Sequence, residues 1–263
     1  MAARKLNAEK QRYHAGVAPE GWRAQNQLRG KMIGIELEVE SEPGNRFQDL
    51  LNALPEHDDQ VDGPAPHFEA DASLDAVRGV EIIFPPYSAA ALRRGETYLN
   101  KAMSALDDSG LVCFDSGQCG MHMNINTGGW SEQKKAVYVA VINNAPTEII
   151  AKLGGRELNR YCAQHPSYPM DHYLTHPGPT HRSIIEHKRG GGRLEARFPA
   201  ATLDGDMIKR LAHFFDILED YAAAIEPRWN RLSGARHWEN FVDSLKASHD
   251  GEANALGTYL ERA

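Results

Sequence analysis

A strictly alternating segment, residues 32–40, constrains the fold more than any other part of this sequence. Successive side chains of a β-strand point to opposite faces, so a period of two predicts a strand with two unlike faces. Four aliphatic side chains share one face: Ile33, Ile35, Leu37 and Val39. Three carboxylates share the other: Glu36, Glu38 and Glu40. The aliphatic face must be covered by other elements, which predicts a sheet with helices packed on it.

Two later segments repeat this pattern. Residues 121–126 place His122, Asn124 and Asn126 opposite three apolar side chains. Residues 193–198 place Arg193, Glu195 and Arg197 opposite Leu194, Ala196 and Phe198. Three separate strands are therefore predicted to have one apolar face and one face of metal-ligand or anion-binding groups.

Strands and helices do not alternate regularly along the chain, which argues against a doubly wound parallel sheet. The pattern predicts an α+β fold, with an antiparallel sheet and helices on one of its faces. Helices are expected at 45–54, 89–109 and 207–225, after Ser131, and again after Pro146. Further strands are expected at 67–71, 79–84 (ended by Pro85-Pro86), 111–115 and 181–187. Residues 1–30 are expected to be a polar arm, and residues 31–263 a single catalytic domain with a C-terminal helical tail.

Composition excludes several classes of protein. The chain has 263 residues, a net charge of −7 and a pI of about 5.9, which argues against binding nucleic acid through a basic face. Its three cysteines form no C-x-x-C pair, so neither a disulfide framework nor a structural zinc site is expected. No secretory leader and no run of 18 apolar residues is found, which predicts a cytoplasmic protein without a membrane span. The oligomeric state stays open.

The acidic face has a specific chemistry. Carboxylates two residues apart on a strand are roughly 6.5–7 Å from each other, and such like charges repel unless solvent or a cation lies between them. A solvated sheet face is the simple alternative, but such faces usually mix Thr, Lys and Ser. Hard oxygen ligands favour Mg²⁺ or Mn²⁺. The carboxylates of Glu36, Glu38, Glu81 and Glu195 exceed what one Mg²⁺ takes, which indicates two or more ions, with His122 and Asp71 as further ligands.

Arginines on the third strand add an anion-binding function. Guanidinium groups bind phosphate and carboxylate through two parallel hydrogen bonds, so Arg193 and Arg197 are predicted to hold an anion. Acidic metal ligands together with such arginines are typical of a site where metal-bound ATP reacts with a carboxylate.

Four motifs, in this order, are similar to those of a known family. They are Gly34-Ile35-Glu36-Leu37-Glu38, Asp71-Ala72-Ser73 followed by Gly79-Val80-Glu81, Cys119-Gly120-Met121-His122-Met123-Asn124, and Arg193-Leu194-Glu195-Ala196-Arg197. Together they resemble the amidoligase family, a branch of the glutamine synthetase and glutamate-cysteine ligase superfamily. The resemblance spans roughly residues 31–226.

The resemblance implies a curved antiparallel sheet whose concave face is the active site, with helices on the convex face. It implies ATP and divalent metals. The metal ligands it implies are Glu36, Glu38, Asp71, Glu81, His122 and Glu195. By the same resemblance, Arg193, Arg197 and Arg160 act in catalysis and, with Asn124, bind the cofactor.

The implied reaction joins a small-molecule or peptide carboxylate to an amine by way of an acyl phosphate. A phosphotransferase of the same fold and a non-catalytic binding module are the alternatives. His172 and His176 have a spacing that suits zinc only on a helix, and the surrounding prolines of residues 162–180 predict a loop instead.

Overall fold

The computed structural model describes residues 31–114, 117–160, 162–164, 183–187, 192–225 and 234–261. The arm predicted over residues 1–30 and most of the loop predicted over 162–180 lie outside these ranges. The chain divides into two compact units, one of Met1–Asn124 with Ala200–Lys209 and one of Ile125–Pro199 with Arg210–Ala263. The single domain predicted for residues 31–263 stays a prediction.

The fold is α+β with a seven-stranded sheet, and the α+β prediction is confirmed. In the first unit the strands lie in the order β2 (His67–Glu69), β3 (Gly79–Ser88), β1 (Met32–Ser41) and β5 (Met121–Asn126). The short β4 (Val112–Cys113) pairs with the end of β1. Pairing of β1 with β3, and of β3 with β2, is antiparallel.

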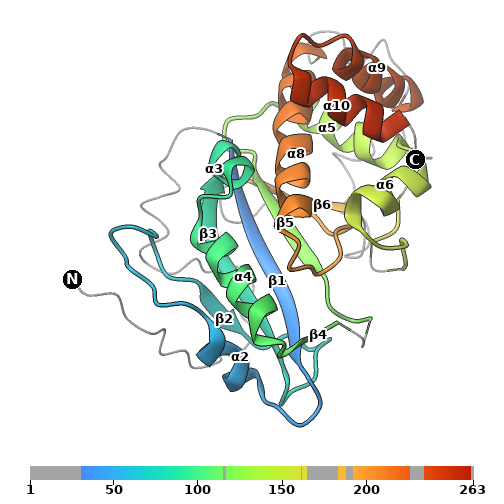
Figure 1. Cartoon of the computed structure of the whole chain (residues 1–263). Coiled ribbons are helices and arrows are strands. Elements are labelled where there is room, and N and C mark those ends of the chain that lie inside the picture. The colour runs from blue at the N-terminus through green and yellow to red at the C-terminus, as the bar shows by residue number, and fades with distance from the viewer. Residues whose placement is uncertain are drawn as a thin grey trace. The chain divides into compact units, whose positions relative to one another are not determined.

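Helices of the first unit pack near the sheet. They are α2 (Phe47–Ala53), α3 (Ala89–Arg94) and α4 (Tyr98–Ser109). Helix α2 contacts β1 and α4, α3 contacts β3, and α4 contacts β4 (Figure 1). The aliphatic side chains of β1 are fully buried from Ile35 to Val39, as are Leu99 and Leu106 of α4. Each such burial contributes roughly 1.5–3 kcal/mol, which fixes the register of β1 and leaves its carboxylates on the other face.

Two expectations for this unit are wrong. Strand β3 continues through Pro85-Pro86 to Ser88. It does so because Ile33 pairs with Tyr87 and Ile35 with Phe84, so that a bulge in the register accommodates the two prolines, which have no N–H to donate. The helix expected over 89–109 is two helices, because Gly95 adopts a left-handed conformation (φ 71°) and ends α3.

The second unit is mainly helical. Its helices are α5 (Glu132–Asn144), α6 (Thr147–Gly154), most of α8 (Gly205–Ile225), α9 (Gly234–Lys246) and α10 (Gly251–Glu261). The expected helix starts after Ser131 and Pro146 are confirmed, and Ser131 caps α5 by accepting a hydrogen bond from the Lys134 backbone N–H at 3.0 Å. Strand β6 (Ile184–His187) pairs antiparallel with β7 (Arg193–Ala196).

Aromatic side chains form the core of this helical unit. The Phe214 and Phe241 rings meet edge to face with centroids 5.8 Å apart, and Phe215 stacks on Tyr138 at 6.5 Å. Among the helices described, each is too short or too polar to cross a bilayer.

Candidate metal site

The acidic face of the first unit is assembled by strand register. Glu38 of β1 lies directly opposite Glu81 of β3, and Glu81 lies opposite Glu69 of β2. Directly opposed residues of antiparallel strands share one face of the sheet. Three strands therefore place three carboxylates in a row, and Glu36 lies one step along β1 on the same face.

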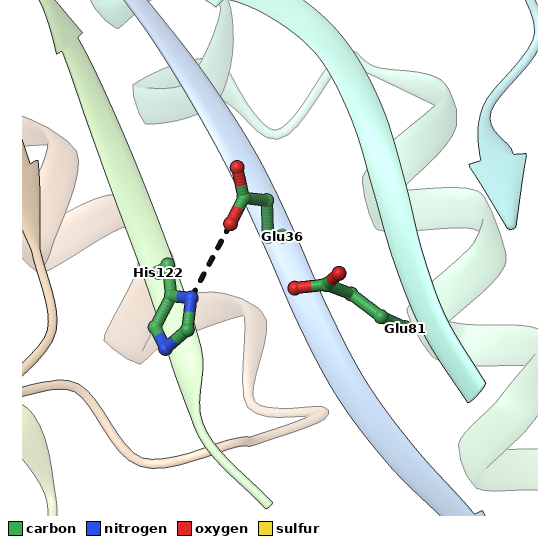
Figure 2. A group of neighbouring side chains, drawn as sticks. All are labelled: Glu36, Glu81 and His122. Carbon is green, nitrogen blue, oxygen red and sulfur yellow. Dashed lines mark hydrogen bonds and ion pairs between the residues drawn. The ribbon is translucent and has the colours of Figure 1, made fainter. Parts of the chain in front are cut away.

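A first group of side chains that could hold a metal ion consists of Glu36, Glu81 and His122. One ligand atom from each lies within 4.8 Å of the others. Figure 2 shows the three side chains, with His122 Nδ1 3.3 Å from Glu36 Oε2. Two oxygens on opposite sides of a bound Mg²⁺ are about 4.2 Å apart, so only small side-chain adjustments are needed to hold an ion.

A second group consists of Glu38, Asp71 and Glu81, again within 4.8 Å of one another. Asp71 comes from the turn before β3, where its Oδ1 accepts hydrogen bonds from the backbone N–H of Ser73 at 2.6 Å and from the Ser73 hydroxyl at 2.5 Å. These bonds hold the Asp71 side chain in place and leave its other oxygen for a ligand. Glu36 and Glu38 thus fall into different groups, while Glu81 belongs to both.

Protein donors orient the carboxylates of β1 as well. The Gly120 backbone N–H donates to Glu38 Oε2 at 2.5 Å, and the Asn124 side-chain amide donates to Glu36 Oε1 at 3.0 Å. Within the part of the chain that the structure describes, Asn124 Oδ1 is buried and has no hydrogen-bond partner. Outer hydrogen bonds of this kind orient metal ligands in known sites. Carboxylates with one imidazole are a donor set that fits Mg²⁺ or Mn²⁺.

Electrostatics of the site favour a cation. Burial, and then the negative charges of Glu36, Glu38, Asp71 and Glu69, raise the pKa of the Glu81 carboxyl to about 9. At neutral pH this carboxyl holds a proton where no cation is bound. A divalent cation bound here would offset the repulsion that the proton otherwise relieves, and its binding would release the proton.

Glu40, which its place on β1 predicts at the rim of the acidic face, is buried, with 2% of its surface exposed. Its Oε1 accepts the Asp75 backbone N–H at 3.0 Å and its Oε2 lies 3.6 Å from Arg78 Nη2. These contacts tie β1 to the turn before β3. Glu40 is therefore a structural residue.

Glu195 and the predicted arginines lie in the second unit. Arg197 Nη1 lies 2.5 Å from Glu195 Oε1, and Arg193 Nη2 lies 3.7 Å from Glu195 Oε2. Glu195 is buried, whereas Arg193 is 40% exposed and Arg197 22% exposed at the side chain. Arg160 lies in a turn and is exposed. The role of Glu195 as a metal ligand and the roles of the three arginines stay predictions.

Two residues of the acidic face are not predicted from the sequence. His67 and Glu69 of β2 share the face of Glu81, with His67 Nε2 3.1 Å from Glu69 Oε1. Their signal is the alternation His67-Phe68-Glu69, in which Phe68 is buried. Three residues are too few for a period of two to stand out.

The chain is similar to some solved structures, at low sequence identity. No family model matches the chain, and no curated protein matches its sequence. The structure is similar to that of a GmaS/ADP complex in conformation 1, at 14% identity and a TM-score of 0.46, over 91% of this chain and 69% of that one. It is also similar to GmaS without ligand, at 13% identity and a TM-score of 0.44, with the same coverage.

A third similar structure is glutamine synthetase from Plasmodium falciparum, at 10% identity and a TM-score of 0.41. The match covers 74% of this chain and 52% of that one. The function of the chain is inferred from its own side chains.

Proposed function

We propose that this protein is a Mg²⁺- or Mn²⁺-dependent enzyme that uses ATP to join a carboxylate to an amine. The observation that carries the proposal is the pair of ligand groups that share the buried Glu81 on one sheet face. A solvated face needs neither burial nor outer hydrogen bonds to its carboxylates. Here Glu38, Glu81 and His122 are all buried. The Asn124 amide of β5 donates a hydrogen bond to Glu36, and the Gly120 backbone N–H just before β5 donates one to Glu38.

In the proposed reaction the carboxylate oxygen attacks the γ-phosphorus of ATP, ADP leaves, and the amine then displaces phosphate from the acyl phosphate. A bound divalent cation neutralises charge on the phosphate oxygens. Glu36, Glu38, Asp71, Glu81 and His122 would hold the cations, which would position the phosphates.

Two arginines of the second unit, Arg193 and Arg197, supply the anion-binding groups of the proposal. Arg193 and Arg197 hold phosphate or substrate carboxylate, and their ion pairs with Glu195 orient both guanidinium groups. Arg160 and Glu195 keep their predicted roles in the proposal, as an anion-binding group and a metal ligand. Asn124 acts on the nucleotide through Glu36, to which its amide donates.

Binding of a non-hydrolysable ATP analogue tests the proposal without knowledge of the substrates. Calorimetric titration of the full chain should show binding that requires Mg²⁺ and is weakened on the order of 10-fold or more in Arg197→Ala, since a charged hydrogen bond contributes about 1.5–3 kcal/mol. Arg94→Ala is the matched control, because Arg94 is exposed and paired with Glu96. Binding that needs no metal and is the same in both variants contradicts the proposal.

Products distinguish the enzymatic alternatives. With candidate acids and amines, ADP release that requires metal and both substrates, together with an amide product in mass spectra, supports the ligase. A phosphorylated acceptor without amide supports the phosphotransferase. Nucleotide binding without any turnover supports the binding module.

A further inference from the structure

Arg197 lies just beyond the last residue that the hairpin of β6 and β7 pairs. Strand β7 ends at Ala196, which is paired with Ile184, and the Arg197 backbone N–H donates to the Ser183 carbonyl at 2.8 Å. The residue that follows, Phe198, is fully buried. Since buried carbonyl groups are costly without a partner, this segment needs hydrogen-bond donors from another element.

Arg156 supplies these donors from one edge of its guanidinium group. Its Nη2 donates to the Arg197 carbonyl at 2.6 Å, and its Nε donates to the Phe198 carbonyl at 3.2 Å. The donors of a guanidinium lie in one plane in a fixed fork, so a single side chain holds two consecutive carbonyls. In the described ranges of the chain Arg156 forms no ion pair with a carboxylate, so its hydrogen bonds are directed at this backbone.

The end of α6 is shaped to bring Arg156 against this segment. Gly155 adopts a left-handed conformation (φ 71°) and ends α6, so the chain turns before Arg156. Gly154 approaches Phe198 so closely that an added Cβ would lie 2.6 Å from the Phe198 carbonyl oxygen. The Phe198 ring in turn packs on Phe215 of α8, with centroids 6.0 Å apart. The backbone to which Arg156 binds is therefore fixed in the core of the second unit.

We propose that Arg156 is a positioning residue, which fixes the backbone of Arg197 so that the Arg197 guanidinium is oriented before an anion binds. The Arg197 backbone is then held at its N–H by Ser183 and at its carbonyl by Arg156. Its side chain is held by Glu195. Groups ordered in advance lose less conformational entropy on binding. The inference rests on the proposed function, in which Arg197 binds phosphate or carboxylate, and adds the residue that orients it.

A double-mutant cycle of nucleotide affinity tests whether Arg156 acts through Arg197. Calorimetric titration of the full chain with Mg²⁺ and a non-hydrolysable ATP analogue measures the dissociation constant. Arg156→Ala should raise this constant on the order of 10-fold, as loss of an outer hydrogen bond does at metal sites. In the Arg197→Ala background the same substitution should raise it by less than about 2-fold, because the side chain that Arg156 orients is absent.

Arg156→Lys separates the geometry of the fork from its charge. Lysine keeps the positive charge, but its ammonium is a single point and lacks two coplanar donor nitrogens. The affinity of this variant should therefore stay close to that of Arg156→Ala. Wild-type affinity in Arg156→Lys would show that charge alone suffices and would overturn the positioning role. The lysine variant also replaces Arg156→Ala in the cycle if circular dichroism shows that the alanine variant does not fold.

Asn254→Ala is the matched control. The Asn254 amide donates to the Lys246 carbonyl at 2.6 Å, a side-chain-to-backbone bond of the same unit at the contact of α9 and α10, so its loss should leave the affinity unchanged. An equal fold-change for Arg156→Ala in both backgrounds overturns the inference and leaves the proposed function standing. Wild-type affinity in Arg156→Ala, with weak binding in Arg197→Ala, does the same. A wild type that binds no nucleotide, or an Arg197→Ala variant that binds as tightly as the wild type, overturns both.

Discussion

Replacing Glu81 with glutamine should remove a pH dependence from the stability of the metal-free protein. Glu81 has a pKa of about 9 in the folded chain against 4.5 as its ordinary value. Between these pH values the folded protein holds a proton that the unfolded chain has released. The unfolding free energy of the wild type therefore falls as pH rises through this window.

The size of the effect follows from the same linkage. One pKa unit corresponds to about 1.4 kcal/mol, so a single proton held only by the folded state lowers the unfolding free energy by about 3 kcal/mol between pH 6 and pH 8. Glutamine resembles the protonated carboxyl but cannot ionise. Glu81→Gln should therefore lack this component of the slope, while all other titrating groups contribute equally to both proteins.

Urea denaturation in EDTA at pH 6, 7 and 8, followed by far-UV circular dichroism, measures the two slopes. Glu56→Gln is the control, because Glu56 is an exposed carboxylate of the same unit and its loss should leave the wild-type slope unchanged. Mg²⁺ at 100 times its dissociation constant should add about 2.7 kcal/mol to the wild type and much less to Glu81→Gln. Equal slopes in EDTA for the wild type and Glu81→Gln refute the electrostatic account of the cluster.

Two further substitutions test how the turn before β3 is held. Gly79→Ala places a Cβ 2.5 Å from the Leu74 Cβ and should lower the unfolding free energy by about 1–3 kcal/mol. Gly251→Ala is the control and should change it little, because no atom lies within 4 Å of its added Cβ. Equal urea midpoints for the two variants would show that the turn rearranges at no cost in free energy. Glu40→Gln removes the charge 3.6 Å from Arg78 Nη2 and should cost about 2–3 kcal/mol by urea denaturation, and a cost below about 0.5 kcal/mol would remove Glu40 from the structural residues.

Much of the acidic face is predictable because a strand has a fixed period. Once residues 32–40 form a strand, burial of Leu37 and Val39 forces Glu36 and Glu38 onto the opposite face. The same reasoning applies to His122, whose neighbours Met121 and Met123 are fully buried. The α+β fold follows from the same faces, since each apolar side needs a covering layer.

The register between neighbouring strands is not predictable from the sequence pattern of each strand. Glu81 stands opposite Glu38 because of the register in which β3 pairs with β1, and a shift of one residue would move Glu81 to the buried face. Glu40 has the parity of a ligand, yet it meets Asp75 and Arg78 because of the turn that follows. Local periodicity contains no information about such long-range partners.

Helix boundaries show a different limit. The apolar positions of residues 89–109 suit one helix, but Gly95 ends the first part in a left-handed conformation and Thr97 begins the second. A glycine inside a periodic segment is compatible with either outcome, at a cost of only about 1 kcal/mol in a continuous helix. Tertiary contacts decide between the two.

The most direct test of the account is a crystal structure with Mn²⁺ bound, with anomalous difference density to locate the ions. Two peaks are expected on the acidic face of β1 and β3, one contacted by Glu36 and His122, the other by Glu38 and Asp71, with Glu81 within reach of both. Contact distances near 2.1–2.2 Å are expected for such oxygen-rich sites. Density at saturating Mn²⁺ that shows no ion within reach of Glu81 would contradict the central claim.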